Sequence, residues 1–183
     1  PAGLCLAAQL SQFPEIETMI IERMPANIIK GKADGINTRT MEMFQAFGFA
    51  DKVKRETYWV NQTAFWMPDP KNPQHIHRVG RVQDVADDSS EMPHILINQA
   101  RLHELFLENM KNSPSRLEPD YGWEVVGLTI DPNTQDHPVT VTLKDSIGVN
   151  WGGTRTVRAN YVVGCDGAHS KVRQAIGGQL HGD

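Results

Sequence analysis

The segment of residues 162–173, VVGCDGAHSKVR, constrains the fold of this chain more than any other. A short apolar run ends in Asp166-Gly167, and a polar turn then leads into a predicted helix that begins at Ser170. We expect residues 161–163 to form a buried strand that presents the Asp166 carboxylate at its carboxyl end. Open α/β sheets bind their ligands at that edge. Packing at the end of a strand requires no charged side chain, so the presence of Asp166 at this position indicates a ligand with hydroxyl groups.

The start of the chain carries a second informative pattern. Residues 1–10 are predicted to form a helix of small residues, in which Gly3 allows close packing against a strand. Residues 18–21 form a β-like run that Glu22 closes. In the dinucleotide-binding fingerprint, an acidic residue about 20 positions after the glycine-rich turn binds a ribose hydroxyl. The strand and the first two glycines of that fingerprint are absent, so we expect a nucleotide-binding domain truncated at its N-terminus.

Composition narrows the class of protein. At 183 residues we expect one domain, and the hydrophobic fraction of 39% and charged fraction of 22% are typical of soluble globular proteins. The net charge of −4, without a Lys/Arg stripe, argues against a nucleic-acid partner. No apolar run approaches the roughly 18 residues that span a bilayer, so we expect no membrane partner. Cys5 and Cys165 lack C-x-x-C spacing, which predicts no metal site and favours the cytoplasm.

The order of apolar patterns predicts an α/β fold with inserted antiparallel elements. Thr38 is placed to cap a helix that Gly48 ends, and Asn98 is placed to cap a second helix. The other expected elements are a loop at 24–37, a strand at 59–67 that Pro68-Asp69-Pro70 breaks, a returning strand at 75–79, a polar loop at 84–91, a strand at 94–97, and a β-meander at 123–130, 139–143 and 155–158.

Five segments together resemble the FAD-dependent aromatic hydroxylases, the single-component flavoprotein monooxygenases of the p-hydroxybenzoate and phenol hydroxylase type. The segments are residues 1–3, Glu22-Arg23, GKADGINTRTMEMF at 31–44, MPHILINQAR at 92–101, and the turn at 165–167. The resemblance implies a glutathione-reductase-type, Rossmann-like FAD-binding domain that is incomplete over residues 1–183. The regions that complete the substrate pocket and close over the flavin are expected to lie outside the chain, which by itself should be inactive.

The resemblance also assigns cofactor roles. Gly3 is the last glycine of the phosphate turn, Glu22 binds the adenosine ribose, and Arg23 lies over the adenine or near the phosphates. A helix-packing glycine, a solvated glutamate and an exposed arginine are the plainer alternatives. The candidates from the rest of the chain are Gln99 for the phosphate–ribityl region of FAD, and Asp166 with Gly167 for the ribityl or ribose hydroxyls.

Two residues are catalytic candidates. Asp34 lies in a glycine-flanked loop, and the resemblance places the matching aspartate near the aromatic substrate and the flavin ring. A carboxylate there accepts the phenol proton, directly or through water, and so activates the ring carbon that is attacked. His94 is a secondary candidate that binds the substrate hydroxyl or relays its proton. The alternatives are a turn-forming aspartate and a histidine that fills the start of a strand.

The resemblance implies that NADPH reduces FAD, that the reduced flavin captures O2 as a C4a-hydroperoxide, and that a small phenolic substrate is then hydroxylated. The expected conversion is 3-hydroxybenzoate to 3,4-dihydroxybenzoate, and the full-length enzyme is expected to be a possible homodimer. Three alternatives stay open. They are the same chemistry on phenol itself, an NAD-dependent dehydrogenase supported by Gly3 and Glu22 alone, and a non-catalytic fragment.

Overall fold

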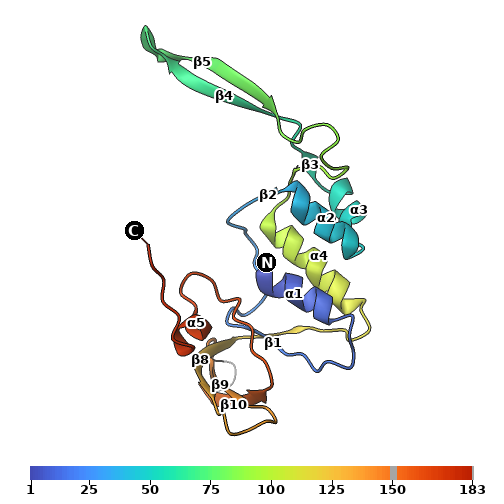
Figure 1. Cartoon of the computed structure of the whole chain (residues 1–183), viewed down its shortest axis with the longest axis vertical. Coiled ribbons are helices and arrows are strands. Elements are labelled where there is room, and N and C mark those ends of the chain that lie inside the picture. Colours follow the sequence, from blue (N-terminus) through green and yellow to red (C-terminus); the bar gives the residue numbers. More distant parts are fainter. Residues whose placement is uncertain (149–151, 183) are drawn as a thin grey trace. The chain divides into compact units, whose positions relative to one another are not determined.

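The computed structural model describes residues 1–148 and 152–182 (Figure 1). Its internal contacts divide the chain into two compact units, the first formed by Pro1–Ile28 with Phe106–Asp183 and the second by Ile29–Leu105. The boundary falls within helix α4, Gln99–Lys111. The single FAD-binding domain expected over residues 1–183 stays a prediction. None of the helices in the described ranges is long and apolar enough to cross a bilayer.

The first unit begins with the two elements expected from the sequence. Helix α1, Ala2–Leu10, buries Ala7 and Ala8, and strand β1, Ile20–Glu22, follows it. Strand β1 pairs in parallel with β7, Pro119–Tyr121. The sequence pattern does not predict β7, because proline and aspartate are depleted in strands, and this strand forms through pairing with β1 rather than through its own propensity.

A three-stranded antiparallel sheet forms the core of the first unit. It contains β8 (Trp123–Ile130), β9 (Val139–Asp145) and β10 (Thr154–Ala159) in the order β10-β9-β8. Val139, Val141 and Leu143 alternate along β9 and are buried, as a strand with one face in the core requires. This confirms the predicted meander.

The expected strand at residues 161–163 is wrong. The segment has no strand assignment, and the exposed fractions of Tyr161 and Val163 are 89% and 64%. No strand of the described residues pairs with this segment, and Val162 packs against the apolar core around β9. Helix α5, Lys171–Ala175, then begins as predicted, since the Ser170 side chain accepts a hydrogen bond from the backbone N–H of Arg173.

The second unit is built around a small antiparallel sheet and three helical segments. Strands β2 (Gly35–Ile36) and β3 (Tyr58–Trp59) both pair with β6 (Ile95–Leu96), in the order β2-β6-β3. Helices α2 (Thr38–Ala46) and α3 (Ala50–Arg55), the first turns of α4, and the residues at and next to β6 contribute the buried side chains, together with Phe49 before α3. These buried residues are Met41, Phe44, Phe49, Ala50, Val53, Ile95, Ile97, Ala100, Leu102 and Leu105.

Asparagine side chains cap the first turns of two helices in this unit. Asn37, not Thr38, caps α2, because its side chain accepts a hydrogen bond from the backbone N–H of Thr40 at 2.9 Å. Asn98 caps α4 as predicted, and its side chain accepts from the N–H of Ala100 at 2.8 Å. Gly48, with φ at +83°, lies just past the end of α2 as expected. The short helix α3 was missed.

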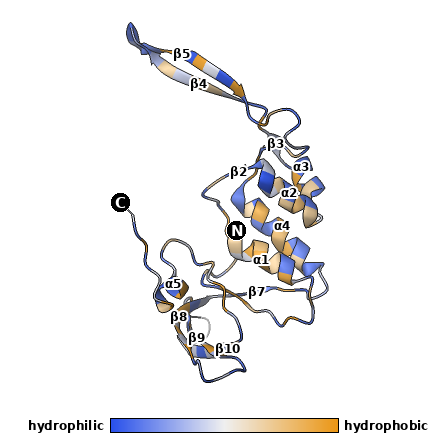
Figure 2. Ribbon diagram, viewed as in Figure 1, coloured by the Kyte–Doolittle hydropathy of each residue, from blue (hydrophilic) through white to orange (hydrophobic). Residues whose placement is uncertain are grey.

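A long β-hairpin completes the second unit. Strands β4 (Gln62–Asp69) and β5 (Asn72–Gln83) pair with each other and with no other strand of the described residues. The predicted break at Pro68-Asp69-Pro70 is confirmed, because β4 ends at Asp69. Pro68 itself still lies within β4, opposite Ile76, where an edge strand tolerates a proline. Figure 2 shows hydrophobic and hydrophilic residues along both strands, in keeping with the exposed side chains of Trp66 and Ile76.

Candidate functional site

The Asp-Gly turn of the first unit is a preformed loop at the N-terminus of α5. One carboxylate oxygen of Asp166 accepts the backbone N–H groups of Lys171 (2.6 Å) and Val172 (3.3 Å). Arg173 donates to the carbonyl of Ala168 at 2.6 Å, so its side chain reaches back to the turn. Burial would raise the pKa of Asp166, but the hydrogen bonds from Ser170, Val172 and Lys171 together lower it. The exposed carboxylate is therefore held ionised.

Two glycines shape this turn. Gly167 has a φ of +79°, which only glycine adopts without strain, and a Cβ there would meet no atom within 4 Å. Gly164 has the opposite constraint, because its Cβ would lie 2.7 Å from the Cβ of Val172. Gly167 thus leaves open space beside Asp166, whereas Gly164 lets the chain pack on α5. No feature of the sequence singled out Gly164.

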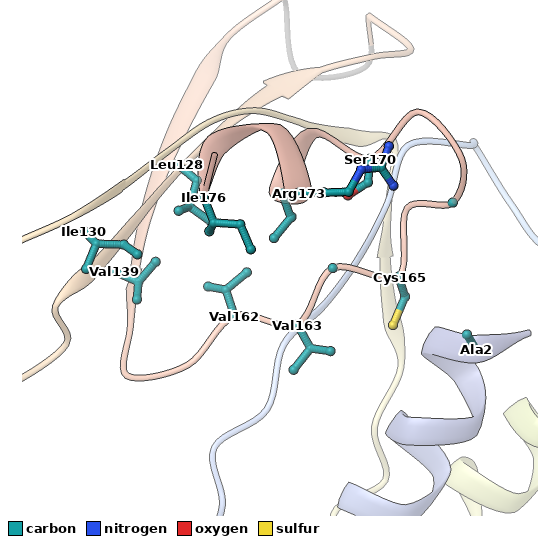
Figure 3. Close-up of a pocket in the computed structure, with 13 residues that line it drawn as sticks. Ala2, Leu128, Ile130, Val139, Val162, Val163, Cys165, Ser170, Arg173 and Ile176 are labelled. Carbon is teal, nitrogen blue, oxygen red and sulfur yellow. The ribbon is translucent and has the colours of Figure 1, made fainter. Parts of the chain in front are cut away.

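Gly3 brings the start of α1 against the same turn. A Cβ on Gly3 would lie 3.3 Å from the Cβ of Cys165, a tight contact. Figure 3 shows the Cys165 side chain directed toward the end of α1 that carries Ala2. Close helix packing is the role of the third glycine in the dinucleotide fingerprint, and the first N–H groups of a helix suit a phosphate. The contact is compatible with Gly3 as the last glycine of the phosphate turn and equally with Gly3 as a glycine that only allows close helix packing.

Glu22 and Arg23 lie at the end of β1. One oxygen of the Glu22 carboxylate accepts the N–H of Met24 at 2.9 Å. Glu22 is paired in register with Tyr121, and burial, with a smaller contribution from the Glu22 charge, raises the pKa of Tyr121. The Arg23 side chain is exposed, and its carbonyl accepts the Ser146 hydroxyl. This hydrogen bond holds Glu22 in place, and the second oxygen of its carboxylate does not take part in it.

A cavity of about 610 Å³ lies between α5, the β8–β9 hairpin and the segment before Asp166. Figure 3 shows Val162, Ile176 and Leu128 directed toward this space. Apart from Ser170 and Arg173, the side chains that line it are apolar. Such a lining does not suit the phosphates and hydroxyls of FAD. The open edge beside Asp166, Gly167 and Gly3 fits a polar cofactor better than this cavity does.

Gln99 is the cofactor candidate of the second unit. Its side-chain carbonyl accepts the backbone N–H of Lys32 at 2.7 Å. Gly31 packs against Gln99 so closely that a Cβ on Gly31 would lie 2.9 Å from the Gln99 backbone nitrogen. These contacts tie the loop that carries Asp34 to the first turn of α4. The amide N–H groups of Gln99 are left as donors for a ligand oxygen.

The two catalytic candidates directly precede neighbouring strands, Asp34 before β2 and His94 before β6. The carbonyl of Asp34 accepts the N–H of Ile97 at 2.8 Å, while the Asp34 side chain is exposed. His94 precedes β6, and its carbonyl accepts the N–H of Val60 at 2.8 Å. In the described residues no hydrogen bond joins the Asp34 and His94 side chains. Because β2 and β6 are antiparallel, with Gly35 opposite Leu96 and Ile36 opposite Ile95, Asp34 and His94 lie at opposite ends of this short ladder. The Asp34 carboxylate is left open.

His94 has a partner that the sequence analysis did not identify. Its Nδ1 lies 2.8 Å from a carboxylate oxygen of Asp84. From the sequence, Asp84 is expected only to begin a polar loop. It lies ten residues before His94 in an acid-rich stretch, and no sequence feature separates it from Asp87 or Asp88. The pairing depends on where β5 ends relative to β6, which a sequence pattern does not reveal.

One face of the small sheet is open beside His94. Gly35 and Tyr58 both lie opposite Leu96 in register, so the three share a face, and alternation places His94 on that face too. Consistent with this, a Cβ on Gly35 would lie 3.5 Å from Nε2 of His94. Leu96 and Tyr58 are exposed. The face is therefore largely apolar, with one imidazole nitrogen at its edge.

Arg101, two residues after Gln99 in α4, has a structural role. Its guanidinium donates to both carboxylate oxygens of Glu56, at 2.6 and 2.9 Å, and to Glu104 at 2.8 Å. The hydrogen bond from Arg101 is also the main reason that the pKa of Glu56 is lowered. This bidentate pair ties α4 to the end of α3.

Comparison with known proteins agrees with this geometry. The sequence pattern described as an FAD binding domain matches residues 1–183, the whole chain. The chain belongs to this FAD-binding family. The 3-hydroxybenzoate 4-monooxygenase of Comamonas testosteroni is 55% identical over 183 residues, which are 100% of this chain and 29% of that enzyme. The FAD-dependent monooxygenase terD of Aspergillus terreus is 33% identical over 187 residues, with the same coverage of 100% and 29%.

Solved structures show the same fold. The flavin-dependent monooxygenase PieE, in complex with FAD and substrate, has a TM-score of 0.78 at 26% identity, over 97% of this chain and 30% of that one. For p-nitrophenol 4-monooxygenase PnpA from Pseudomonas putida the TM-score is 0.79 at 20% identity, over 97% and 41%, which shows the fold alone. The expected α/β FAD-binding fold and its family are confirmed. The chain spans less than a third of the length of the two curated relatives described.

Proposed function

We propose that this chain is part of a flavoprotein monooxygenase that uses NADPH and O2 to hydroxylate 3-hydroxybenzoate to 3,4-dihydroxybenzoate. The observation that carries the proposal is the 55% identity, over the whole chain, to 3-hydroxybenzoate 4-monooxygenase. Membership of the FAD-binding family disfavours the alternative of an NAD-dependent dehydrogenase. A homodimer of the full-length enzyme and a cytoplasmic location stay predictions.

The residues of the first unit are suited to hold the cofactor. Asp166 would bind the ribityl or ribose hydroxyls, with Gly167 leaving room beside it, and Glu22 would bind the adenosine ribose. Gly3, at the N-terminus of α1, and Arg23 would meet the phosphates or the adenine. When bound, FAD supplies the redox chemistry that activates dioxygen, which protein side chains do not perform.

The residues of the second unit are suited to act on the substrate and on the cofactor. Gln99 would donate its amide N–H groups to the phosphate–ribityl region. The open apolar face formed by Gly35, Tyr58 and Leu96 suits an aromatic ring, and the nitrogen of His94 at its edge suits the ring hydroxyl. Asp34 and His94 would take up the phenol proton, and the resulting phenolate is the more electron-rich ring.

The full-length protein provides the test of this function. It should purify with bound FAD, oxidise NADPH faster when 3-hydroxybenzoate is added, and release 3,4-dihydroxybenzoate, as followed by absorbance and product chromatography. Benzoate is the matched control, because it keeps the carboxylate but has no hydroxyl to deprotonate. A protein without flavin and without turnover would refute the proposal. A preference for phenol over 3-hydroxybenzoate would instead show a substrate of the phenol hydroxylase type.

Asp166 should govern flavin retention. In the full-length protein, Asp166→Ala removes the ligand for the cofactor hydroxyls and the acceptor for two N–H groups of α5, so the FAD content after dialysis should fall severalfold. Asp131→Ala removes another turn aspartate of the same unit, hydrogen-bonded to Asn133 and Thr134, and should retain FAD. A fully flavin-loaded Asp166→Ala protein contradicts the assignment.

The lowered pKa of Asp166 adds a pH dependence. Because the folded protein stabilises the carboxylate, the stabilisation is complete above the usual aspartate pKa and is lost as the pH falls through the lower folded value. The wild-type thermal midpoint should therefore fall toward that of Asp166→Ala in acid. A difference between the two midpoints that stays constant from neutral to acidic pH would contradict this.

A further inference from the structure

We propose that Asp84 is the positioning residue of His94: its carboxylate keeps a proton on Nδ1, so that Nε2 faces the open side of the β2-β6-β3 sheet as a proton acceptor. This inference rests on the proposed function, because it assigns His94 the role of taking the proton of a phenolic substrate. Neither Asp84 nor the pair was among the residues suggested by the sequence.

The geometry of the pair supports a defined orientation of the ring. The Nδ1–carboxylate distance of 2.8 Å is that of a charge-assisted hydrogen bond. The exposed fractions of the His94 and Asp84 side chains are 30% and 19%, so the protein shields both from most of the solvent. Asp84 is itself fixed, because its backbone N–H donates to the carbonyl of Asn61 at 3.0 Å.

The hydrogen bond also determines the tautomer of the neutral ring. An ionised carboxylate only accepts hydrogen bonds, so Nδ1 must be the donor and Nε2 must carry the lone pair. Nε2 lies on the side of Gly35, where a Cβ would be 3.5 Å away, and Gly35 directly follows Asp34. When Nε2 accepts a proton, the Asp84 carboxylate stabilises the imidazolium that forms, as in a Ser-His-Asp triad.

Substitutions in the full-length enzyme test the positioning role. Asp84→Asn keeps the size of the side chain but offers an N–H to Nδ1, which favours the wrong tautomer. We expect kcat for hydroxylation of 3-hydroxybenzoate to fall by roughly 10-fold to 100-fold, with FAD content unchanged. Asp88→Asn, an equal change of charge at an exposed position of the same loop, is the matched control and should leave kcat within about twofold of wild type.

A double-mutant cycle separates positioning from general damage to the fold. If Asp84 acts through His94, then Asp84→Asn adds nothing once His94→Asn is present, and the double variant should have the kcat of His94→Asn alone. If the fold-losses in kcat of the two single variants multiply in the double variant, the proposal is overturned. So would an Asp84→Asn enzyme with the same kcat as the Asp88→Asn control.

A measurement on the wild-type enzyme does not depend on how any variant folds. Solid-state NMR of protein labelled with ¹⁵N-histidine reads which ring nitrogen is protonated, and the His94 signals are those lost in His94→Asn. Protonated Nδ1 with unprotonated Nε2 supports the proposal, and the opposite tautomer overturns it. If the wild-type enzyme hydroxylates no phenol, the proposed function fails, whereas this spectrum still reports whether Asp84 sets the tautomer.

Discussion

Replacing Gly31 with alanine in the full-length enzyme should both destabilise the fold and remove most of the activity. A Cβ on Gly31 would lie 2.9 Å from the backbone nitrogen of Gln99 and closer still to its Cβ, and the first turn of a helix cannot move aside cheaply. The loop must shift instead, which breaks the hydrogen bond from Lys32 to Gln99 and displaces Asp34. We expect a loss of roughly 1–3 kcal/mol in the free energy of unfolding.

The loss of activity should be larger than the loss of stability suggests. A displacement of about 1 Å of a catalytic group costs on the order of 100-fold in rate, and Asp34 is only three residues from Gly31. Chemical denaturation and steady-state hydroxylation assays measure the two effects. Gly80→Ala in β5 is the control, because a Cβ there would lie 3.8 Å from the Phe65 ring and should be accommodated. Wild-type stability and kcat in Gly31→Ala would show that the loop contact is unimportant.

Local physical chemistry explains which elements could be predicted from the sequence. The helix caps at Asn98 and Ser170 involve residues at most three positions apart, and α4 has its apolar residues spaced to form one face. The alternating pattern of β9 likewise stands in a few consecutive residues. Elements that depend on pairing with a strand elsewhere in the chain were predicted less accurately. Residues 161–163 were apolar enough for a buried strand, but no described strand pairs with them.

The candidate site divides in the same way. Asp34, Asp166 and Gly167 stand in local motifs that resemble a family, so their residue numbers could be proposed from the sequence. The partner of His94 could not, since the Asp84 contact depends on how the end of β5 lies relative to β6, and these two strands belong to different sheets. The same holds for Gly31, whose importance comes from a residue 68 positions further along the chain. Contacts of this kind require coordinates.

Replacing Asp34 should separate chemistry from cofactor binding more cleanly than any other substitution. Asp34 contributes its backbone carbonyl to the β2–β6 sheet, whereas its exposed carboxylate makes no hydrogen bond or ion pair within residues 1–148 and 152–182. Asp34→Ala in the full-length enzyme should therefore keep its fold and its FAD. If the carboxylate takes the phenol proton, kcat for hydroxylation should fall about 100-fold to 10,000-fold.

Asp34→Asn completes this test, because it keeps the shape of the side chain and removes only its charge and basicity. Both variants should show the flavin spectrum and thermal midpoint of wild type, so that a lost activity cannot be attributed to unfolding. The coupling of NADPH oxidation to product, measured by chromatography, distinguishes a lost proton acceptor from a lost substrate site. An aspartate that only forms a turn would contribute to stability and not to the reaction rate. Normal product formation by Asp34→Asn, together with a lowered thermal midpoint, would therefore show that Asp34 has only this structural role.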